Sequence, residues 1–255
     1  MIAFSLQRTL LTALVAFTAC AAKPAVADQP AATAPSTQAA DFDWRANLGT
    51  RPLSVSNVNG RIRITRASGN EARVRATKAG RDAPQVRIEL DETKSHVAIR
   101  VIHPRRVVQD AHVDFEIELP AGAEFDARTT NGNVSADDLQ GTVSVASTNG
   151  SVSFSGTPTA LKASSVNGKV TVDLGRVKAP SAEVEAVNGR LDLTLAKDAD
   201  TRVSARTVTG RIASDFDLPE HRQTVGSTVD GTLGAGHGNV RLSTVNGSIA
   251  IRRRG

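Results

Sequence analysis

The stretch ASSVNGKVTVDL, residues 163–174, contains a Val-Asn-Gly triplet that returns at a fixed interval along the chain. Val187-Asn188-Gly189 follows 21 residues later, and Val208-Thr209-Gly210 and Val229-Asp230-Gly231 follow at the same interval. Short stretches in which apolar and polar residues alternate come after most of these corners. A period near twenty residues is typical of a repeat architecture, in which neighbouring units stabilise each other.

Related corners occur on both sides of this region. From Gly132 to Gly247 the corner glycines are spaced 18, 18, 21, 21, 21 and 16 residues apart. The residues predicted to form structural corners are Asn59, Gly60, Asn131, Gly132, Asn149, Gly150, Asn167, Gly168, Asn188, Gly189, Gly210, Gly231, Asn246 and Gly247.

Two all-β architectures are compatible with these corners. Asn-Gly is a strong signal for a tight hairpin, which predicts an antiparallel β-meander or sandwich. The alternative is a repetitive β-solenoid, similar to a single-stranded β-helix, with repeats of 18–21 residues. In the solenoid, Asn167, Asn188 and Asn246 form a ladder of side-chain hydrogen bonds, with Thr209 and Asp230 as polar substitutes. Glycine supplies a left-handed bend in either case. The nearly equal repeat lengths favour the solenoid, because stacked coils need equal lengths and hairpins do not.

The chain divides into an export segment, a linker and a β-rich part. Residues 1–27 are predicted to be a signal peptide, or 1–19 if the protein is a lipoprotein. Residues 28–46 are predicted to be a flexible linker, because DQPAATAPSTQAAD at 28–41 has almost nothing to bury. An N-terminal β-strand region (47–120) and a β-strand repeat region (121–255) follow and are expected to be continuous. From Leu53 onward apolar residues alternate with polar ones, which indicates strands.

The export signal has two interpretations. The apolar stretch LLTALVAFTA, at 10–19, is too short to cross a bilayer, and AVA at 25–27 fits cleavage by ordinary secretion. Cys20, the only cysteine, ends FTAC, which resembles a lipobox and makes Cys20 a lipidation candidate. Cleavage before Cys20 lowers the net charge from +5 to +4, and cleavage after Ala27 lowers it to +3. This mild excess, without interleaved aromatic residues, argues against nucleic-acid binding.

The segments LSVSNVNGRIRI and FEIELPAGAEFDARTTNGNVSADDLQGTVSVASTNGSVSF resemble a broad bacterial family of β-strand-repeat envelope proteins. That family is known only as candidate adhesins of unknown function. The resemblance runs from about Leu53 to Ile251. It implies the repeat fold and supplies no catalytic motif.

No catalytic, metal or cofactor site is predicted. Asp137 and Asp138 are adjacent, so on a strand their carboxylates point to opposite faces. The pairs Asp198/Asp200 and Asp215/Asp217 are typical of solvated loops. His112 and Asp114 share a strand face, but two ligands are too few for a metal site.

Two arginine clusters are the candidate contacts for polyanions: Arg105 with Arg106, and Arg252, Arg253 and Arg254. They are predicted either to protect an exposed sheet edge or to bind phosphate or carboxylate groups of envelope polymers. No exposed apolar patch of any length is expected. The sequence therefore predicts an exported, non-catalytic scaffold in the periplasm or on the outer membrane, which binds an envelope polymer or a protein. Its only membrane contact is a possible lipid anchor at Cys20. The alternatives are a carbohydrate-active enzyme on a β-helix and a sensory component of the envelope.

Overall fold

The computed structural model describes residues 41–104, 110–222 and 226–255, which belong to one compact unit, Gln38–Gly255. These residues form nineteen strands and one short 3-10 helix, η1, at Ala83–Gln85. No other helix occurs in this part of the chain, so the predicted all-β class is confirmed.

The strands are β1 (Phe42–Asn47), β2 (Leu53–Asn59), β3 (Ile62–Arg66), β4 (Glu71–Ala79), β5 (Arg87–Glu92), β6 (Val97–Ile102), β7 (His112–Leu119), β8 (Phe125–Asn131), β9 (Val134–Asn149), β10 (Val152–Asn167), β11 (Val170–Leu174), β12 (Ser181–Asn188), β13 (Leu191–Leu195), β14 (Thr201–Thr209), β15 (Ile212–Ser214), β16 (Glu220–Arg222), β17 (Ser227–Leu233), β18 (Gly238–Asn246) and β19 (Ile249–Arg253).

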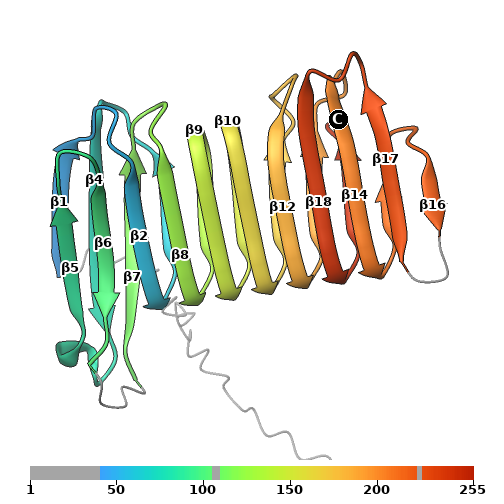
Figure 1. Cartoon of the computed structure of the whole chain (residues 1–255). Coiled ribbons are helices and arrows are strands. Elements are labelled where there is room, and N and C mark those ends of the chain that lie inside the picture. The colour runs from blue at the N-terminus through green and yellow to red at the C-terminus, as the bar shows by residue number, and fades with distance from the viewer. Residues whose placement is uncertain (1–40, 105–109, 223–225) are drawn as a thin grey trace, which may run out of the picture. The chain divides into compact units, whose positions relative to one another are not determined.

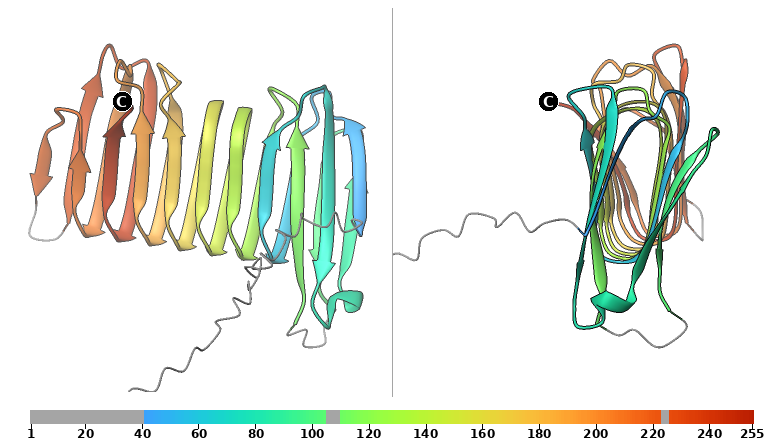
Figure 2. Two further views of the ribbon diagram at one scale, coloured as in Figure 1. Left: turned by 180° about the vertical axis from the view of Figure 1, so that it is seen from behind. Right: turned by 90° about the vertical axis from the view of Figure 1, so that its left-hand side faces the viewer.

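Each repeat is a coil with one strand in each of two facing sheets, the front and back sheets of Figure 1. The two sheets are seen nearly edge on in the right-hand view of Figure 2, joined by the curved corners. The long strands β9 and β10 pass from the back sheet to the front sheet, and each contributes to both. Neighbouring coils pair in parallel, so Ser165 lies beside Ser147 on one side and Ala186 on the other. This pairing confirms the predicted solenoid.

The order of the coils differs from their order in the chain. The last coil, β18–β19, lies between β12–β13 and β14–β15, because β18 pairs with both β12 and β14 and β19 pairs with both β13 and β15. The front sheet runs β5, β6, β2, β8, β9, β10, β12, β18, β14, β17, β16. The back sheet runs β1, β4, β7, β3, β9, β10, β11, β13, β19, β15.

Antiparallel strands close both ends of the stack. β4 and β1 continue the back sheet beyond β7, and β5 continues the front sheet beyond β6. Trp44 Nε1 and Arg51 Nη1 both donate to the carboxylate of Glu92, at 3.0 and 2.9 Å. The hydrogen bond from Trp44, together with that from Arg51, lowers the pKa of Glu92. Because Trp44 is on β1 and Glu92 on β5, these bonds tie the two sheets together at this end.

The core lies between the two sheets and is filled by the side chains at every second position of each strand. Val145, Ala163 and Val184 face it from the front sheet, and Val170 and Leu191 from the back sheet. Their small size allows the sheets to approach closely, which fits the aromatic-poor composition.

The Asn-Gly corners join the front sheet to the back sheet, and no hairpin forms there. The asparagine side chains make a continuous ladder in which each amide donates to the side-chain oxygen of the next coil, over 2.8–2.9 Å. The ladder runs from Asn246 through Asn188, Asn167, Asn149 and Asn131 to Asn59. Thr209 lies beside Asn246 at the end of the ladder, and no side-chain hydrogen bond joins the two.

The corner glycines are required by close stacking of the backbone. A Cβ at Gly168 would lie 2.1 Å from the carbonyl oxygen of Gly150, and one at Gly189 would lie 1.9 Å from that of Gly168. Gly60 has a φ of 118°, but Gly168 and Gly189 lie outside the left-handed region. The prediction of a left-handed bend at every corner is therefore wrong.

Two further sequence predictions are corrected. Gly231 forms no corner, because β17 runs antiparallel to β14 and pairs Gly231 with Val203 and Asp230 with Ser204. The Leu218 side chain covers this position, and a Cβ at Gly231 would lie 2.6 Å from Leu218 Cδ2. The linker ends before residue 46, because β1 starts at Phe42 and buries Trp44 against the core. The predicted signal peptide, Cys20, Arg105 and Arg106 lie outside the described residues.

Candidate binding surfaces

The terminal arginines lie at the end of β19 and just beyond it. Arg252 and Arg253 pair with β13 on one side, whereas β15 pairs only with Ile249–Ile251, so the protection of a sheet edge stays a prediction. The Arg253 guanidinium lies 5.0 Å from the ring centroid of Phe216 and donates to the carbonyl of Asp215 at 2.9 Å. Arg252 is exposed and makes no ion pair with any described residue.

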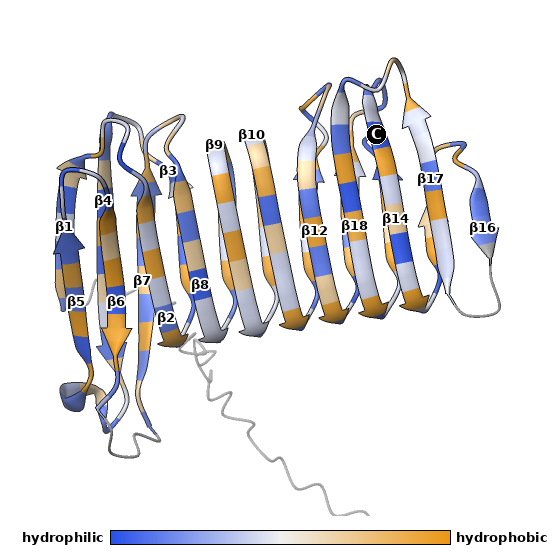
Figure 3. Cartoon of the chain, viewed as in Figure 1, coloured by the Kyte–Doolittle hydropathy of each residue, from blue (hydrophilic) through white to orange (hydrophobic). Residues whose placement is uncertain are grey.

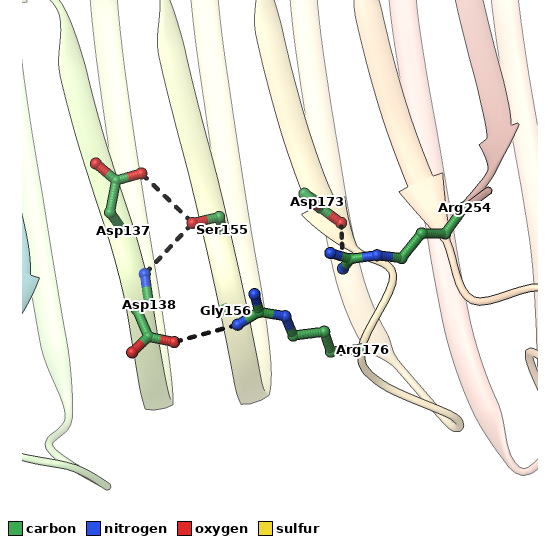
Figure 4. A pocket seen from close by; sticks show the side chains of 7 residues that line it. All are labelled: Asp137, Asp138, Ser155, Gly156, Asp173, Arg176 and Arg254. Carbon is green, nitrogen blue, oxygen red and sulfur yellow. Dashed lines mark hydrogen bonds and ion pairs between the residues drawn. The ribbon is translucent and has the colours of Figure 1, made fainter.

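Arg254 reaches a pocket of about 400 Å³ on the back sheet, shown in Figure 4. We call it the carboxylate–arginine pocket. It is lined by Asp137, Asp138, Ser155, Gly156, Asp173, Arg176 and Arg254. Asp137 and Asp138 both line it, contrary to the prediction of opposite faces, because Asp138 adopts a left-handed conformation with φ 55° where β9 turns between the sheets.

The charges of this pocket largely satisfy one another. Arg254 Nη1 lies 3.6 Å from Asp173 Oδ1, and Arg176 Nη1 lies 3.7 Å from Asp138 Oδ1. Ser155 Oγ donates to Asp137 Oδ1 at 3.4 Å. Carboxylates, guanidinium groups and a hydroxyl in one pocket can exchange hydrogen bonds with a hydroxyl-rich ligand.

The direction of the carboxyl pKa shifts bears on acid–base chemistry. In the described part of the chain, the carboxyl groups with a clear shift are those of Asp43, Glu92, Asp192 and Asp200, and all four have a lowered pKa. A general acid in a paired-carboxylate hydrolase needs a raised pKa. None of these four lines the carboxylate–arginine pocket.

Asp200 fixes a loop, a structural role that the sequence pattern did not indicate. The hydrogen bond from His237, with backbone amides contributing, lowers the pKa of Asp200 to about 2. Asp200 Oδ2 lies 2.6 Å from His237 Nδ1, and Asp200 Oδ1 accepts a bond from the Gly236 amide. These contacts hold the loop between β17 and β18.

His112 and Asp114 do not form a metal site. Asp114 instead pairs with Arg61, with its Oδ2 3.0 Å from Nε. No group of three or more potential metal ligands occurs among residues 41–104, 110–222 and 226–255.

The front sheet carries an exposed apolar feature that was not expected from the sequence. Val166, Val187, Val245 and Val208 lie at the lower ends of β10, β12, β18 and β14, the orange tips in Figure 3. These strands are consecutive neighbours, and the four side chains are 39–43% exposed. We call them the valine row. The prediction that no apolar patch is exposed is therefore wrong.

The valine row borders a shallow groove of about 610 Å³ that crosses the front sheet, here called the front groove. Small side chains form its floor, among them Ala146, Ser164 and Ser243, which lie in register on β9, β10 and β18. Arg128 and Glu185 also line it. Its surface therefore combines aliphatic groups, hydroxyls and opposite charges.

No aromatic side chain is fully exposed on the described surface. Trp44 and the phenylalanines at 115, 125, 154 and 216 are buried, and Phe42 is partly buried. The exposed groups of the described surface are thus mainly aliphatic, hydroxyl and charged. In the same residues, no helix is long and apolar enough to cross a membrane.

Solved structures with a similar chain path come from several bacteria. A candidate cell adhesion protein from Clostridium sporogenes is 12% identical, with a TM-score of 0.46 over 84% of this chain and 99% of that chain. A candidate adhesin from Bacteroides fragilis is 16% identical, with a TM-score of 0.41 over 84% and 96% of the two chains. No curated protein matches the chain.

The family comparison covers most of the sequence. The model of the Toastrack family, DUF4097, matches residues 34–252, which include every coil described above except the last residue of β19. This match confirms the family resemblance of the repeat segments. The chain belongs to the Toastrack family.

Proposed function

We propose that this protein is an exported, non-catalytic binding scaffold of the bacterial envelope, of the adhesin type, whose ligand is an envelope polymer or a protein. The observation that carries the proposal is the front groove. It crosses β8, β9, β10, β12 and β18 in register, so an extended ligand meets equivalent positions on successive coils.

A rigid frame supports such a role. Parallel backbone pairing, the asparagine ladder and the antiparallel ends fix the position of each coil relative to its neighbours. A ligand that spans several coils then binds a surface already in place, which lowers the entropic cost of association.

The non-catalytic part of the proposal is supported by the carboxylate–arginine pocket. Asp138 and Asp173 are each paired with an arginine, and Asp137 accepts a hydrogen bond from Ser155. This arrangement suits binding, because the charges are matched before a ligand arrives. Export is supported by the apolar segment at 10–19 and the small residues at 25–27.

The test is binding of the purified chain to isolated envelope fractions: glycolipid, peptidoglycan and extracellular polysaccharide. Ser164→Trp fills the front groove from β10, and Ser153→Trp, on the same strand but in the back sheet, is the matched control. We expect saturable binding to at least one fraction, lost in Ser164→Trp and kept in Ser153→Trp.

Binding to none of the fractions contradicts the proposal, and so does binding that Ser164→Trp leaves unchanged. Two further outcomes also contradict it. Equal loss of binding in both tryptophan variants shows that the front groove is not the contact. Loss of polymer mass during incubation shows that the protein is an enzyme. Unfolding midpoints of both variants, measured in urea, establish that the fold is intact.

A further inference from the structure

Three arginines form a cluster on the outer face of the front sheet. Arg202 and Arg206 lie on β14 on either side of Ser204, and Arg241 on β18 pairs with Ser204. Their neighbours Val203, Ala205, Val240 and Leu242 are buried, so the three arginines point outward, and all are exposed. Same-face neighbours along a strand are about 6.6 Å apart and diagonal neighbours about 7–8 Å. The three guanidinium groups therefore project from one stretch of the outer face, on either side of Ser204 and beside it.

The cluster carries uncompensated charge. None of the three makes an ion pair with any residue that the structure describes, unlike Arg128, whose guanidinium is held by Asp126 at 2.8 Å. The acidic groups nearest in register are Glu183, beside Arg241, and Asp230, beside Ser204. Glu183 is engaged by Lys162 Nζ at 3.1 Å. Asp230 lies on the same outer face, and Glu185 lies beside Ser243 on β18. Neither makes an ion pair with the three arginines, so their guanidinium groups outnumber the carboxylates around Ser204 and remain open to an anion.

The valine row begins directly below this cluster. Val208 is two residues from Arg206 on β14, and Val245 is the next member of the row on β18. From there the row continues over Val187 to Val166 along the front groove, a length of about 14 Å at the usual strand spacing. A basic cluster is therefore continuous with an exposed aliphatic strip.

We propose that this surface binds an anionic amphiphile at a lipid surface. Its anionic headgroup lies on Arg202, Arg206 and Arg241, and its aliphatic part lies against the valine row. This inference rests on the proposed binding function and names its ligand class. Arginine forks match phosphate and carboxylate geometry, and exposed valines lose water favourably against acyl chains. The described surface lacks fully exposed aromatic rings of the kind that nucleic-acid bases stack on, and here it combines three guanidinium groups with an aliphatic strip.

The experiment measures co-sedimentation of the purified full chain with vesicles of phosphatidylcholine containing phosphatidylglycerol, and with phosphatidylcholine alone. The arginine variant is Arg202→Gln/Arg206→Gln/Arg241→Gln. The matched control is Arg63→Gln/Arg87→Gln/Arg100→Gln, three exposed arginines on β3, β5 and β6 that lack ion pairs with described residues. Both variants lose the same net charge, so only position differs.

We expect binding to the anionic vesicles only. At about 1 kcal/mol per arginine near an anionic surface, the arginine variant should bind about a hundredfold more weakly, and the control within about threefold of the parent chain. Changing the four valines of the row to threonine should weaken binding about tenfold, because apolar surface is lost. The fold should be kept, because threonine already occupies the equivalent positions 130 and 148.

Several results overturn the inference. Equal weakening in both arginine variants shows that only net charge matters. Unchanged binding of the valine variant, with full displacement by millimolar inorganic phosphate, shows a simple anion site. Failure to bind vesicles while a polysaccharide or peptidoglycan fraction is bound contradicts this inference alone, and failure to bind every fraction contradicts the proposed function as well.

Discussion

At the scale of single residues, the corners are held by buried hydroxyls as well as by the asparagine ladder. Ser165 Oγ donates to the Gly150 carbonyl at 2.8 Å, and Ser147 Oγ donates to that of Gly132 at the same distance. Thr207 and Thr244 make the corresponding bonds in their coils. Ala186 occupies this position on β12 and cannot donate, so the row of hydroxyls has one gap.

Filling this gap should stabilise the protein. In Ala186→Ser the new hydroxyl lies where Ser165 lies in the preceding coil, and we expect it to donate to the Gly168 carbonyl. The gain in the free energy of unfolding should be about 0.5–1.5 kcal/mol, and Ser165→Ala should lose a similar amount. Urea denaturation measures both. Ser164→Ala, whose side chain faces outward, is the control, and a destabilised Ala186→Ser would contradict the argument.

The corner glycines should tolerate no Cβ. Gly168→Ala puts a methyl group 2.1 Å from the Gly150 carbonyl oxygen, and the stacked backbone cannot move away without breaking the ladder. We expect a loss of about 3 kcal/mol in the free energy of unfolding, at the upper end of overpacking effects. Gly69→Ala is the matched control, because nothing lies within 4 Å of its Cβ position. Thermal unfolding compares the two, and a near-neutral Gly168→Ala would show that the coils can separate.

Residue-scale predictions from the sequence succeeded where one residue type recurs in register. The asparagines could be predicted to form a ladder, since identical side chains one coil apart can bond in series. The valine row was not predicted, although the sequence contained a signal for it. In the alternating pattern of β10, Val166 falls on the face opposite to the buried Ala163 and Ser165, and it should therefore point outward. Asp137 and Asp138 could not be placed, since alternation fails at the left-handed Asp138.

At the scale of elements, β18 and its preceding loop depend on one carboxylate. Asp200, at the start of β14, accepts hydrogen bonds from the Gly236 and His237 amides and faces the His237 ring. Its pKa of about 2 in the folded protein lies below the ordinary value of 3.8. The loop should therefore be fully stabilised above the ordinary value and lose this stabilisation as pH falls through 3.8 toward 2.

Hydrogen exchange of the Gly236 amide tests this pH dependence. Its protection factor should fall between pH 5 and pH 2 in the parent chain. In Asp200→Asn it should be low throughout and change little with pH. Asp198→Asn, which alters an exposed carboxylate of the same connection, should behave like the parent. A protection factor independent of pH in the parent chain would show that the carboxylate does not hold the loop.

The order of the coils could not be predicted from strand patterns. Buried and exposed residues alternate in the same way in β14 and β18, so either strand could have paired with β12. The ladder gives a physical reason for the observed order. Asn246 donates to Asn188 at 2.9 Å, whereas Thr209 has no side-chain amide to continue the series. Placing Thr209 at the end of the ladder keeps every asparagine bonded to another.

At the scale of the whole molecule, the inserted coil makes the C-terminal half cooperative. In a stack built in chain order, the last coil has one neighbour, and its loss shortens the stack by one unit. Here β18–β19 is the shared neighbour of β12–β13 and β14–β15, so four other strands depend on it.

Deletion of residues 238–255 should therefore unfold much more than one coil. We expect amides of β14, β15 and β17 to lose protection from hydrogen exchange, because each reaches the stack only through β18 and β19, while coils from β2 to β11 stay protected. The urea m-value should fall in proportion to the surface no longer buried. If the β14 amides stayed protected in the shortened chain, β14 would have to pair directly with β12. Backbone pairing alone would then be enough to stack the coils, and the asparagine ladder would fix only their order.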